Sequence, residues 1–157
     1  MSITQKAIGK IFTDVKTFNE VAGSLSNVSK ESIALQLDLL QEEYLETVEA
    51  YDNNNPIEFA DGVADCLVII LGMVQKCEAA GYDMDEDLYR VCANNLSKYI
   101  PVGEAIHYNP EYTKELNEKH QVFVLKNVVG KIMKPSDFKS VDLSDCVPEG
   151  FFEGGVV

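Results

Sequence analysis

The sequence is poor in positive charge. Its 157 residues include 13 Lys and Arg against 26 Asp and Glu, a formal net charge of −13 with neutral His. A surface this acidic repels the phosphate backbone of nucleic acids, so we expect no nucleic-acid partner. It leaves room for one small phosphorylated ligand, because clustered carboxylates can hold Mg²⁺ and the metal then attracts the phosphates. The length fits one domain that buries its own core.

Cysteine, histidine and long apolar runs are also scarce. The four cysteines lie far apart, no Cys-x-x-Cys pair occurs and only two His are present, so the sequence does not predict a zinc site. The first residues form a polar amphipathic stretch and not a signal peptide. The longest apolar run, Cys66 to Val74, has nine residues, against the ~18–20 that a membrane-spanning helix needs. We therefore expect a cytoplasmic protein with no membrane partner, and reduced core cysteines at Cys66 and Cys77.

Hydrophobic periodicity predicts four helices in the first hundred residues. Apolar side chains at spacings of three and four form stripes over residues 3–22 and 30–51. Asn55 as N-cap and Pro56 at the first helical position begin a third helix, which Gly81 ends. A fourth helix is expected from Asp83 to Tyr99.

The chain changes character after residue 99. Pro101, Gly103 and Pro110 interrupt the helical pattern, residues 111–119 could form a short helix, and residues 121–125 and 131–134 predict a hairpin near 121–134. We therefore expect one all-α domain over residues 1–143. It is a four-to-five-helix bundle, with a helical core at 3–99 and an extension at 100–143 that carries a small C-terminal β-hairpin. Residues 144–157 are expected to form a loose tail.

The second helix carries closely spaced carboxylates. Glu42, Glu43, Glu46 and Glu49 follow one another at intervals of one, three and three residues, which stacks several of them on one face. Like charges at that spacing destabilise a helix by an amount similar to the ~0.2–0.5 kcal/mol that an opposite pair contributes. A solvated acidic face and a metal-binding face both fit this helix when it is considered alone, and Glu49 is assigned to the surface.

The sequence of the third helix favours the metal-binding interpretation over a solvated acidic face. Asp61 and Asp65 share a face, and after Asp65 the helix is apolar all round for two turns, which predicts a segment buried on most sides. An enclosed carboxylate needs a compensating partner, and the next cation on the helix, Lys76, is three turns away. A divalent cation shared with Glu43 and Glu46 across an antiparallel helix pair meets that need. Hard oxygen ligands suit Mg²⁺ or Mn²⁺.

Several segments resemble the all-α nucleoside triphosphate pyrophosphohydrolases, a superfamily that includes MazG-like proteins, dimeric dUTPases and phosphoribosyl-ATP pyrophosphohydrolases. The sequences LLQEEYLE at 39–46 and FADGVADCL at 59–67 resemble its two acidic motifs. The sequences FNEVAG at 18–23, NNLSK at 94–98 and GKIMKPSDF at 130–138, ending in DL at 142–143, resemble the phosphoribosyl-ATP pyrophosphohydrolase-like branch common in phages and bacteria. The resemblance covers residues 12–143.

The resemblance implies hydrolysis of a nucleoside triphosphate, which we expect to be a deoxynucleotide, to the monophosphate and pyrophosphate in control or cleaning of the nucleotide pool. Glu42 is implied to orient or deprotonate the water that attacks the α-phosphorus. The implied metal ligands for Mg²⁺, or Mn²⁺, are Glu43, Glu46, Asp61 and Asp65. The implied catalytic cations are Lys98 and Lys131, and the implied substrate-binding residues are Asn19, Asn95 and Lys134. Without the motif match each lysine is simply a surface residue. The resemblance would place Phe18 in a base pocket, but we assign it to the core.

Some alternatives stay open at this point. The commonest form of the second motif has Glu where this chain has Gly62, so the fourth ligand is Asp61 or Glu58, and Glu58 also fits helix capping. The runner-up activity is that of a phosphoribosyl-ATP pyrophosphohydrolase of histidine synthesis. An inactive helical partner-binding module is the alternative from another class. Short helices leave an apolar side open, so we expect a homodimer or homotetramer.

Overall fold

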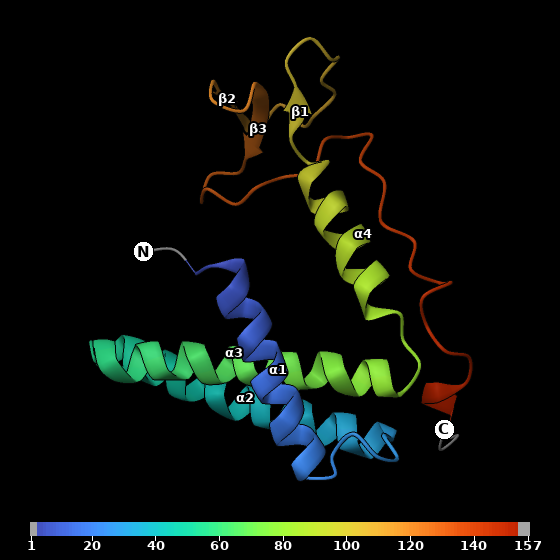
Figure 1. Ribbon diagram of the computed structural model, residues 1–157. Helices are drawn as coiled ribbons and strands as arrows, with labels where there is room; N and C mark the ends of the chain where they lie inside the picture. The colour runs from blue at the N-terminus through green and yellow to red at the C-terminus, as the bar shows by residue number, and fades with distance from the viewer. Residues whose placement is uncertain (1–2, 154–157) are drawn as a thin grey trace. The chain divides into compact units, whose positions relative to one another are not determined.

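A computed structural model of the chain describes residues 3–153. The chain divides into two compact units, each of which is described by itself (Figure 1). Unit 1 comprises Met1–Met84 and Cys146–Val157, and unit 2 comprises Asp85–Asp145. The expected single domain over 1–143 stays a prediction. Within residues 3–153, no helix combines the length and the apolar character that crossing a bilayer requires.

Unit 1 is built from three helices, α1 (Gln5–Val21), α2 (Lys30–Asp52) and α3 (Pro56–Ala79). Local sequence fixes where each begins, because the first N–H groups of a helix need acceptors from outside it. Thr4 accepts from the Ala7 N–H group, Ser29 and Ser32 form a reciprocal capping box, and Asn55 caps the helix that Pro56 begins. These boundaries confirm the first three predicted helices.

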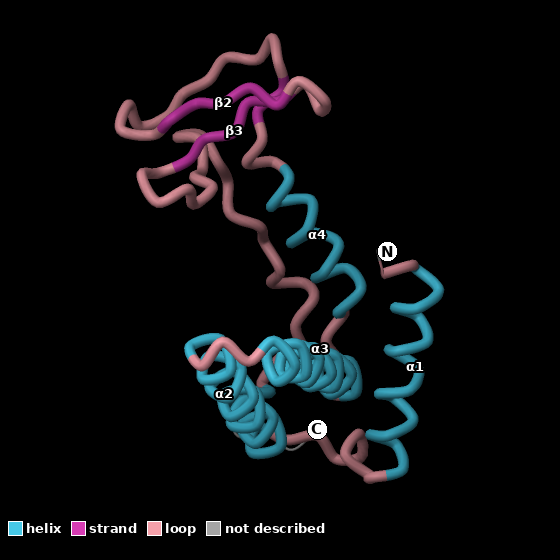
Figure 2. Tube along the Cα trace, turned by 90° about the vertical axis from the view of Figure 1, so that its left-hand side faces the viewer, coloured by secondary structure: helices cyan, strands magenta, loops and turns pink. Residues whose placement is uncertain are grey.

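The helices α2 and α3 run side by side in opposite directions, and α1 packs on α3 (Figures 1 and 2). Asn53 and Asn54 turn the chain between α2 and α3, and Asn54 takes a positive φ of 53° that Asn tolerates. The turn is short, so the acidic face of α2 and the first turns of α3 are necessarily neighbours.

Residues 146–153 belong to unit 1 and pack on its other residues, which differs from the expected loose tail. The Asp83 N–H group donates to the Cys146 carbonyl at 2.8 Å, and a short 3₁₀ helix, η1 (Phe151–Glu153), follows. Phe151 is 3% exposed and clusters with Val28, Ile33 and Ala80. Residues 154–157 of the predicted tail lie outside the described residues.

The predicted burial of α3 on most sides is wrong for the single chain. Val63, Leu67 and Ile70 recur along one stripe of the helix and are 37–50% exposed. The helix packs mainly on α2 and α1, and the exposure of these three side chains shows that neither helix covers the stripe. Apolar side chains on α2, including Leu37 and Leu45, are exposed as well.

Unit 2 contains α4 (Met84–Leu96), whose first residue lies at the end of unit 1, and a small antiparallel sheet. The strands β1 (Ile100–Pro101), β2 (Thr113–Asn117) and β3 (Val122–Lys126) lie in the order β1-β3-β2. The short helix expected at 111–119 is therefore wrong, because Thr113–Asn117 is a strand. The hairpin is also shifted, since β3 pairs in full with β2 and only one bridge, Lys126 to Ile132, reaches the predicted partner.

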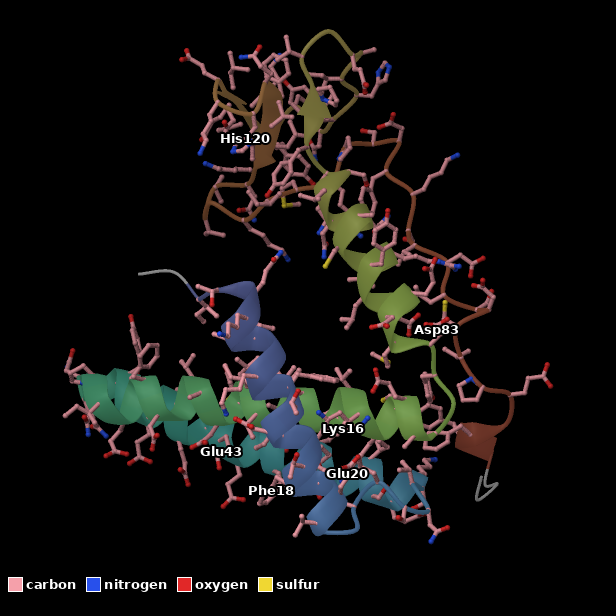
Figure 3. All side chains as sticks on the ribbon, in the orientation of Figure 1. Lys16, Phe18, Glu20, Glu43, Asp83 and His120 are labelled. Atoms are coloured by element: carbon pink, nitrogen blue, oxygen red, sulfur yellow. The ribbon has the colours of Figure 1, made fainter. Side chains whose placement is uncertain are left out.

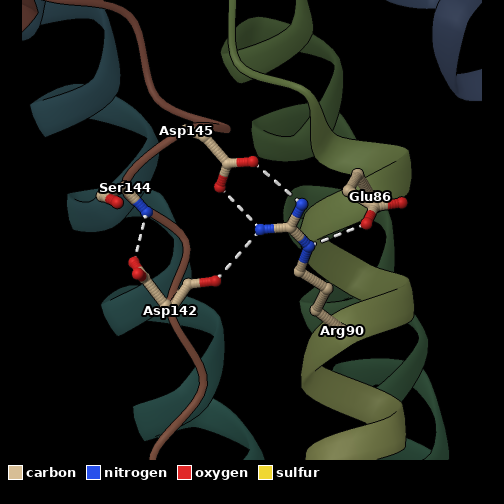
Figure 4. Close-up of polar contacts among 5 residues, drawn as sticks. All are labelled: Glu86, Arg90, Asp142, Ser144 and Asp145. Atoms are coloured by element: carbon tan, nitrogen blue, oxygen red, sulfur yellow. Dashed lines mark hydrogen bonds and ion pairs between the residues drawn. The ribbon is translucent and has the colours of Figure 1, made fainter.

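Arg90 fastens the last part of unit 2 to α4 (Figure 4). Its guanidinium donates to both carboxylate oxygens of Asp145, at 2.6 and 3.0 Å, and to the Asp142 carbonyl at 3.2 Å. Glu86, one turn earlier on α4, accepts from Arg90 Nε at 2.7 Å. The planar fork of Arg suits this two-oxygen contact, which a Lys could not reproduce. The contact holds residues 142–145 against α4 within unit 2.

Candidate functional site

At Gly62 the backbone of α3 lies against Thr47 of α2. Gly62 is buried, and a Cβ atom there would lie 3.2 Å from Thr47 Cβ and still closer to the Thr47 hydroxyl. That hydroxyl donates to the Glu43 carbonyl at 2.7 Å and faces Cys66 Sγ at 3.9 Å. Gly62 stands where the acidic motif that this sequence resembles most often has Glu, and here the position is taken up by contact with α2.

Five carboxylates gather on the neighbouring faces of α2 and α3: Glu42, Glu43, Glu46, Asp61 and Asp65. Glu43, labelled in Figure 3, is half-buried, and its pKa is raised above the ordinary value. The main cause is loss of water around the carboxyl group, and the next causes are the negative charges of Asp65, Glu46, Glu42 and Asp61. The charges of Glu46, Asp61, Asp65 and Glu42 therefore act on Glu43, and a role of these residues in metal binding or water activation stays a prediction.

The cluster has hard oxygen donors and a surplus of negative charge. No ion pair between described residues joins a Lys or Arg to any of the five carboxylates. Oxygen donors without a cationic neighbour suit Mg²⁺ or Mn²⁺. Among residues 3–153, however, no three Asp, Glu, His or Cys side chains lie in an arrangement that could hold a metal ion. Carboxylates repel one another, so convergence of these ligands is expected only together with a cation.

Glu58 and Asp61 have different surroundings. Asp61 is among the charges that act on Glu43, and Glu58 is not. Glu58 lines a pocket of about 300 Å³ with Glu46 and Glu49, at the end of α2 and the start of α3. Its own N–H group donates to the Asn55 side chain at 3.3 Å, so its backbone belongs to the helix cap. Glu58 therefore shares a pocket with Glu46, whereas Asp61 acts on Glu43.

A second pocket of about 260 Å³ lies where α1, α2 and α3 meet. Predicted substrate-binding Asn19 lines it, is buried, and donates to Gln75 Oε1 at 3.0 Å while accepting from the Ser24 hydroxyl at 3.0 Å. The predicted core position of Phe18 is wrong, because this side chain is 72% exposed at the rim of the same pocket (Figure 3). Helix α1 ends three residues after Phe18, and nothing in the described part of the chain covers that side.

Three buried polar residues near this pocket were not predicted from the sequence. Gln36 donates to the Ile69 carbonyl at 3.1 Å, and Gln75 donates to the Phe12 carbonyl at 3.0 Å. Lys76 is 5% exposed, its Nζ donates to the Ser32 carbonyl at 3.3 Å, and burial lowers its pKa. The sequence held one signal for Lys76. It follows Gly72 by four residues and so lies on the same, buried side of α3.

The remaining predicted site residues lie in unit 2. Lys98 Nζ donates to Asn95 Oδ1 at 2.6 Å, so these two predicted residues lie together. Lys134 Nζ lies 4.7 Å from the centre of the Phe138 ring, in a cation–π contact. The Lys131 side chain is exposed, and its N–H group donates to Asn127 Oδ1 at 2.9 Å. That these four residues bind a substrate together with the carboxylates of unit 1 stays a prediction.

Comparison of the chain with protein-family models, with curated proteins and with solved structures finds no match in any of the three. The functional interpretation consequently depends on the residues themselves and on the resemblance of their motifs.

Proposed function

We propose that the chain hydrolyses a nucleoside triphosphate to the monophosphate and pyrophosphate, with Mg²⁺ held by the carboxylates of α2 and α3. The observation that carries the proposal is the group of four carboxylates around half-buried Glu43, with no cation paired to any of the five among the described residues; the raised pKa of Glu43 agrees with it. A protein gains nothing in stability from such a cluster, since it costs desolvation and repulsion. A bound divalent cation offsets both.

The residues divide into two roles. Glu43, Glu46, Asp61 and Asp65 would hold Mg²⁺, and the ion supplies Lewis-acid stabilisation of the charge on the phosphate oxygens. Glu42 is exposed beside Glu43, displaced by one residue around the helix, and would orient a water molecule and accept its proton. Attack at the α-phosphorus then releases pyrophosphate. Lys98 and Lys131 would neutralise the triphosphate, and a deoxynucleotide is the expected substrate.

The decisive experiment is a panel of canonical and damaged ribo- and deoxynucleoside triphosphates with Mg²⁺, with the products identified by chromatography. We expect a monophosphate and pyrophosphate in equal amounts, and no inorganic phosphate as the first product. The Asp65→Asn variant should abolish the activity while keeping its helical circular dichroism. Release of inorganic phosphate alone, or full activity in Asp65→Asn, would contradict the proposal.

The same panel separates the two other candidates. Phosphoribosyl-ATP pyrophosphohydrolase activity in histidine synthesis is the second enzyme candidate, and phosphoribosyl-ATP belongs in the panel for that reason. A helical partner-binding module without activity would leave every substrate intact, and Mg²⁺ would then have no effect on stability that depends on Asp65.

A further inference from the structure

The pocket between α1, α2 and α3 contains a buried ammonium group that the carboxylate chemistry does not use. Lys76 lines this pocket, is 5% exposed and forms no ion pair within the described residues. An ammonium carries three N–H donors and no acceptor. Among residues 3–153, Lys76 Nζ makes a single hydrogen bond, to the Ser32 carbonyl. A buried charge with so little compensation is costly unless a ligand supplies acceptors.

The rest of the lining suits a flat heterocycle better than a phosphate group. Apolar side chains of all three helices form most of the walls, and the other polar lining groups are the Ser24 hydroxyl and the amides of Asn19 and Gln36. Each of these also takes part in a hydrogen bond within the protein. A Cβ atom on Gly72 would lie 3.2 Å from both amide nitrogens, so the glycine lets the two amides reach the surface of α3. Amides can donate and accept, whereas Lys76 only donates.

The pocket continues the carboxylate face along the same two helices. Leu39 lines it and precedes Glu43 by one turn of α2, and Ile69 lines it and follows Asp65 by one turn of α3. The near edge of the pocket thus lies about one turn of helix, ~5 Å, from the carboxylates, and Lys76 follows Asp65 by eleven residues, ~16 Å along α3. A nucleotide bound with its phosphates at the carboxylates can therefore place its base in this pocket.

We propose that Lys76 makes this pocket selective for bases with an exocyclic oxygen at the position where adenine and cytosine carry an amino group. The inference rests on the proposed function. The exocyclic oxygen of such a base accepts a hydrogen bond from the Lys76 ammonium. An exocyclic amino group points its own hydrogens at the ammonium and leaves the charge of Lys76 without an acceptor. Sites with buried polar groups discriminate most strongly against ligands that leave those groups without a partner. The substrate class is then deoxyuridine-, thymidine-, deoxyguanosine- or deoxyinosine-like triphosphates.

The test uses substrates that differ in this group and in the hydrogen on the adjacent ring nitrogen, dITP against dATP and dUTP against dCTP, with kcat/KM measured at one Mg²⁺ concentration. We expect the wild type to prefer the oxo member of each pair by about tenfold or more, the effect of one hydrogen bond to a charged group. Lys76→Met should lower kcat/KM for the oxo members and bring each ratio close to one. Lys16→Met is the matched control, because Lys16 is exposed on α1 next to the pocket-lining Val15 and should keep the wild-type ratio (Figure 3).

Direct binding separates failure of this inference from failure of the proposed function. Deoxyinosine and deoxyadenosine, which carry no phosphate, are compared by saturation-transfer NMR without metal. Stronger binding of deoxyinosine that disappears in Lys76→Met supports the pocket even if no triphosphate is hydrolysed. Hydrolysis without an oxo preference, or a preference that survives in a folded Lys76→Met or Lys76→Gln variant, overturns the inference and leaves the proposed activity standing. Absence of nucleoside binding also overturns it.

Discussion

Gly62 of α3 lies directly against Thr47 of α2, so the two long helices pack here without a side chain on α3. A Cβ atom on Gly62 would lie 3.2 Å from Thr47 Cβ, tighter than ordinary van der Waals contact, and closer still to the hydroxyl. Gly in a helix interior costs about 0.5–1 kcal/mol relative to Ala. The missing Cβ atom offsets that cost, because it lets α3 lie against Thr47 of α2 next to Asp61 and Asp65.

Gly62→Ala should therefore destabilise the protein, by about 1–3 kcal/mol of overpacking. Urea denaturation measures the change. Gly9→Ala is the matched control, since Gly9 lies inside α1 and a Cβ atom there would meet no neighbour within 4 Å, so this change should stabilise by up to about 1 kcal/mol. Adding Thr47→Ala to Gly62→Ala should recover part of the loss. Equal stability changes for Gly9→Ala and Gly62→Ala would contradict the close helix contact.

The raised pKa of Glu43 makes stability depend on pH. The folded protein holds this proton more tightly than the unfolded chain, whose ordinary value is 4.5, so the folded state is favoured at low pH. As pH rises through the raised folded pKa, Glu43 ionises beside the other carboxylates and stability falls. The unfolding free energy of wild type without Mg²⁺ should thus drop more between pH 4.5 and 7 than that of Glu43→Gln. Glu49→Gln, outside the charges that act on Glu43, should behave like wild type.

Mg²⁺ binding should separate the roles of the acidic residues on α2. At a concentration 100-fold above its Kd, a ligand of the native state adds about 2.7 kcal/mol, which is roughly 5–10 °C in Tm for a chain of this size. We expect that shift in wild type and in Glu42→Gln, and a smaller one in Glu46→Gln and Asp65→Asn. Glu42→Gln should nevertheless lower kcat by ~10²–10⁴-fold. Loss of the Tm shift in Glu42→Gln would instead make Glu42 a metal ligand.

The lysines of unit 2 give a separate prediction. Lys98→Ala and Lys131→Ala should weaken triphosphate binding, and should affect the monophosphate product less because it carries fewer charges to neutralise. Isothermal titration with a non-hydrolysable triphosphate and with the monophosphate measures both. Lys119→Ala is a control on the turn between β2 and β3, outside the motif matches. Equal losses for all three variants would indicate general electrostatics.

The sequence predicted those features of the fold and the site that depend on interactions between residues close together in the chain. Helix starts at Ser29 and Asn55 follow from side chains that cap their own helices, and the spacing of Glu43 and Glu46 fixes their shared face. The pairing of β3 could not be predicted in this way. Its strand propensity is local, but the choice between residues 113–117 and 131–134 as partner depends on register and turn geometry.

Burial was the other property that spacing did not predict. The all-round apolar pattern after Asp65 predicted an enclosed helix, yet Leu67 and Ile70 remain exposed in the single chain. Lys76, by contrast, occupies the last turns of α3, where a cation is expected to face solvent near the helix C-terminus. Tertiary packing with α2 buries it instead.

The exposed stripe of α3 should mediate self-association. Val63, Leu67 and Ile70 are 37–50% exposed along one side of the helix, and apolar surface of this kind is favourably buried between subunits. Light scattering at micromolar concentration should give a dimer or tetramer. The double variant Leu67→Glu/Ile70→Glu should be a folded monomer, whereas Val128→Glu, at a 95% exposed turn position in unit 2, should keep the wild-type mass. A monomeric wild type would contradict the prediction.

Lys76 should also control stability in the absence of any ligand. Burial lowers its pKa below the ordinary value of 10.5, so the unfolded chain binds this proton more tightly than the folded protein. Its contribution to stability is therefore largest at high pH and is lost as pH falls through the lowered folded pKa. Lys76→Met keeps the apolar stem and removes the charge, and it should raise the unfolding free energy at pH 7 by about 1–3 kcal/mol. That advantage should shrink as pH approaches 10, in urea titrations of both proteins at each pH. A variant less stable than wild type at pH 7 would show that the folded protein compensates the ammonium group fully, and that Lys76 has no unmet need for an acceptor.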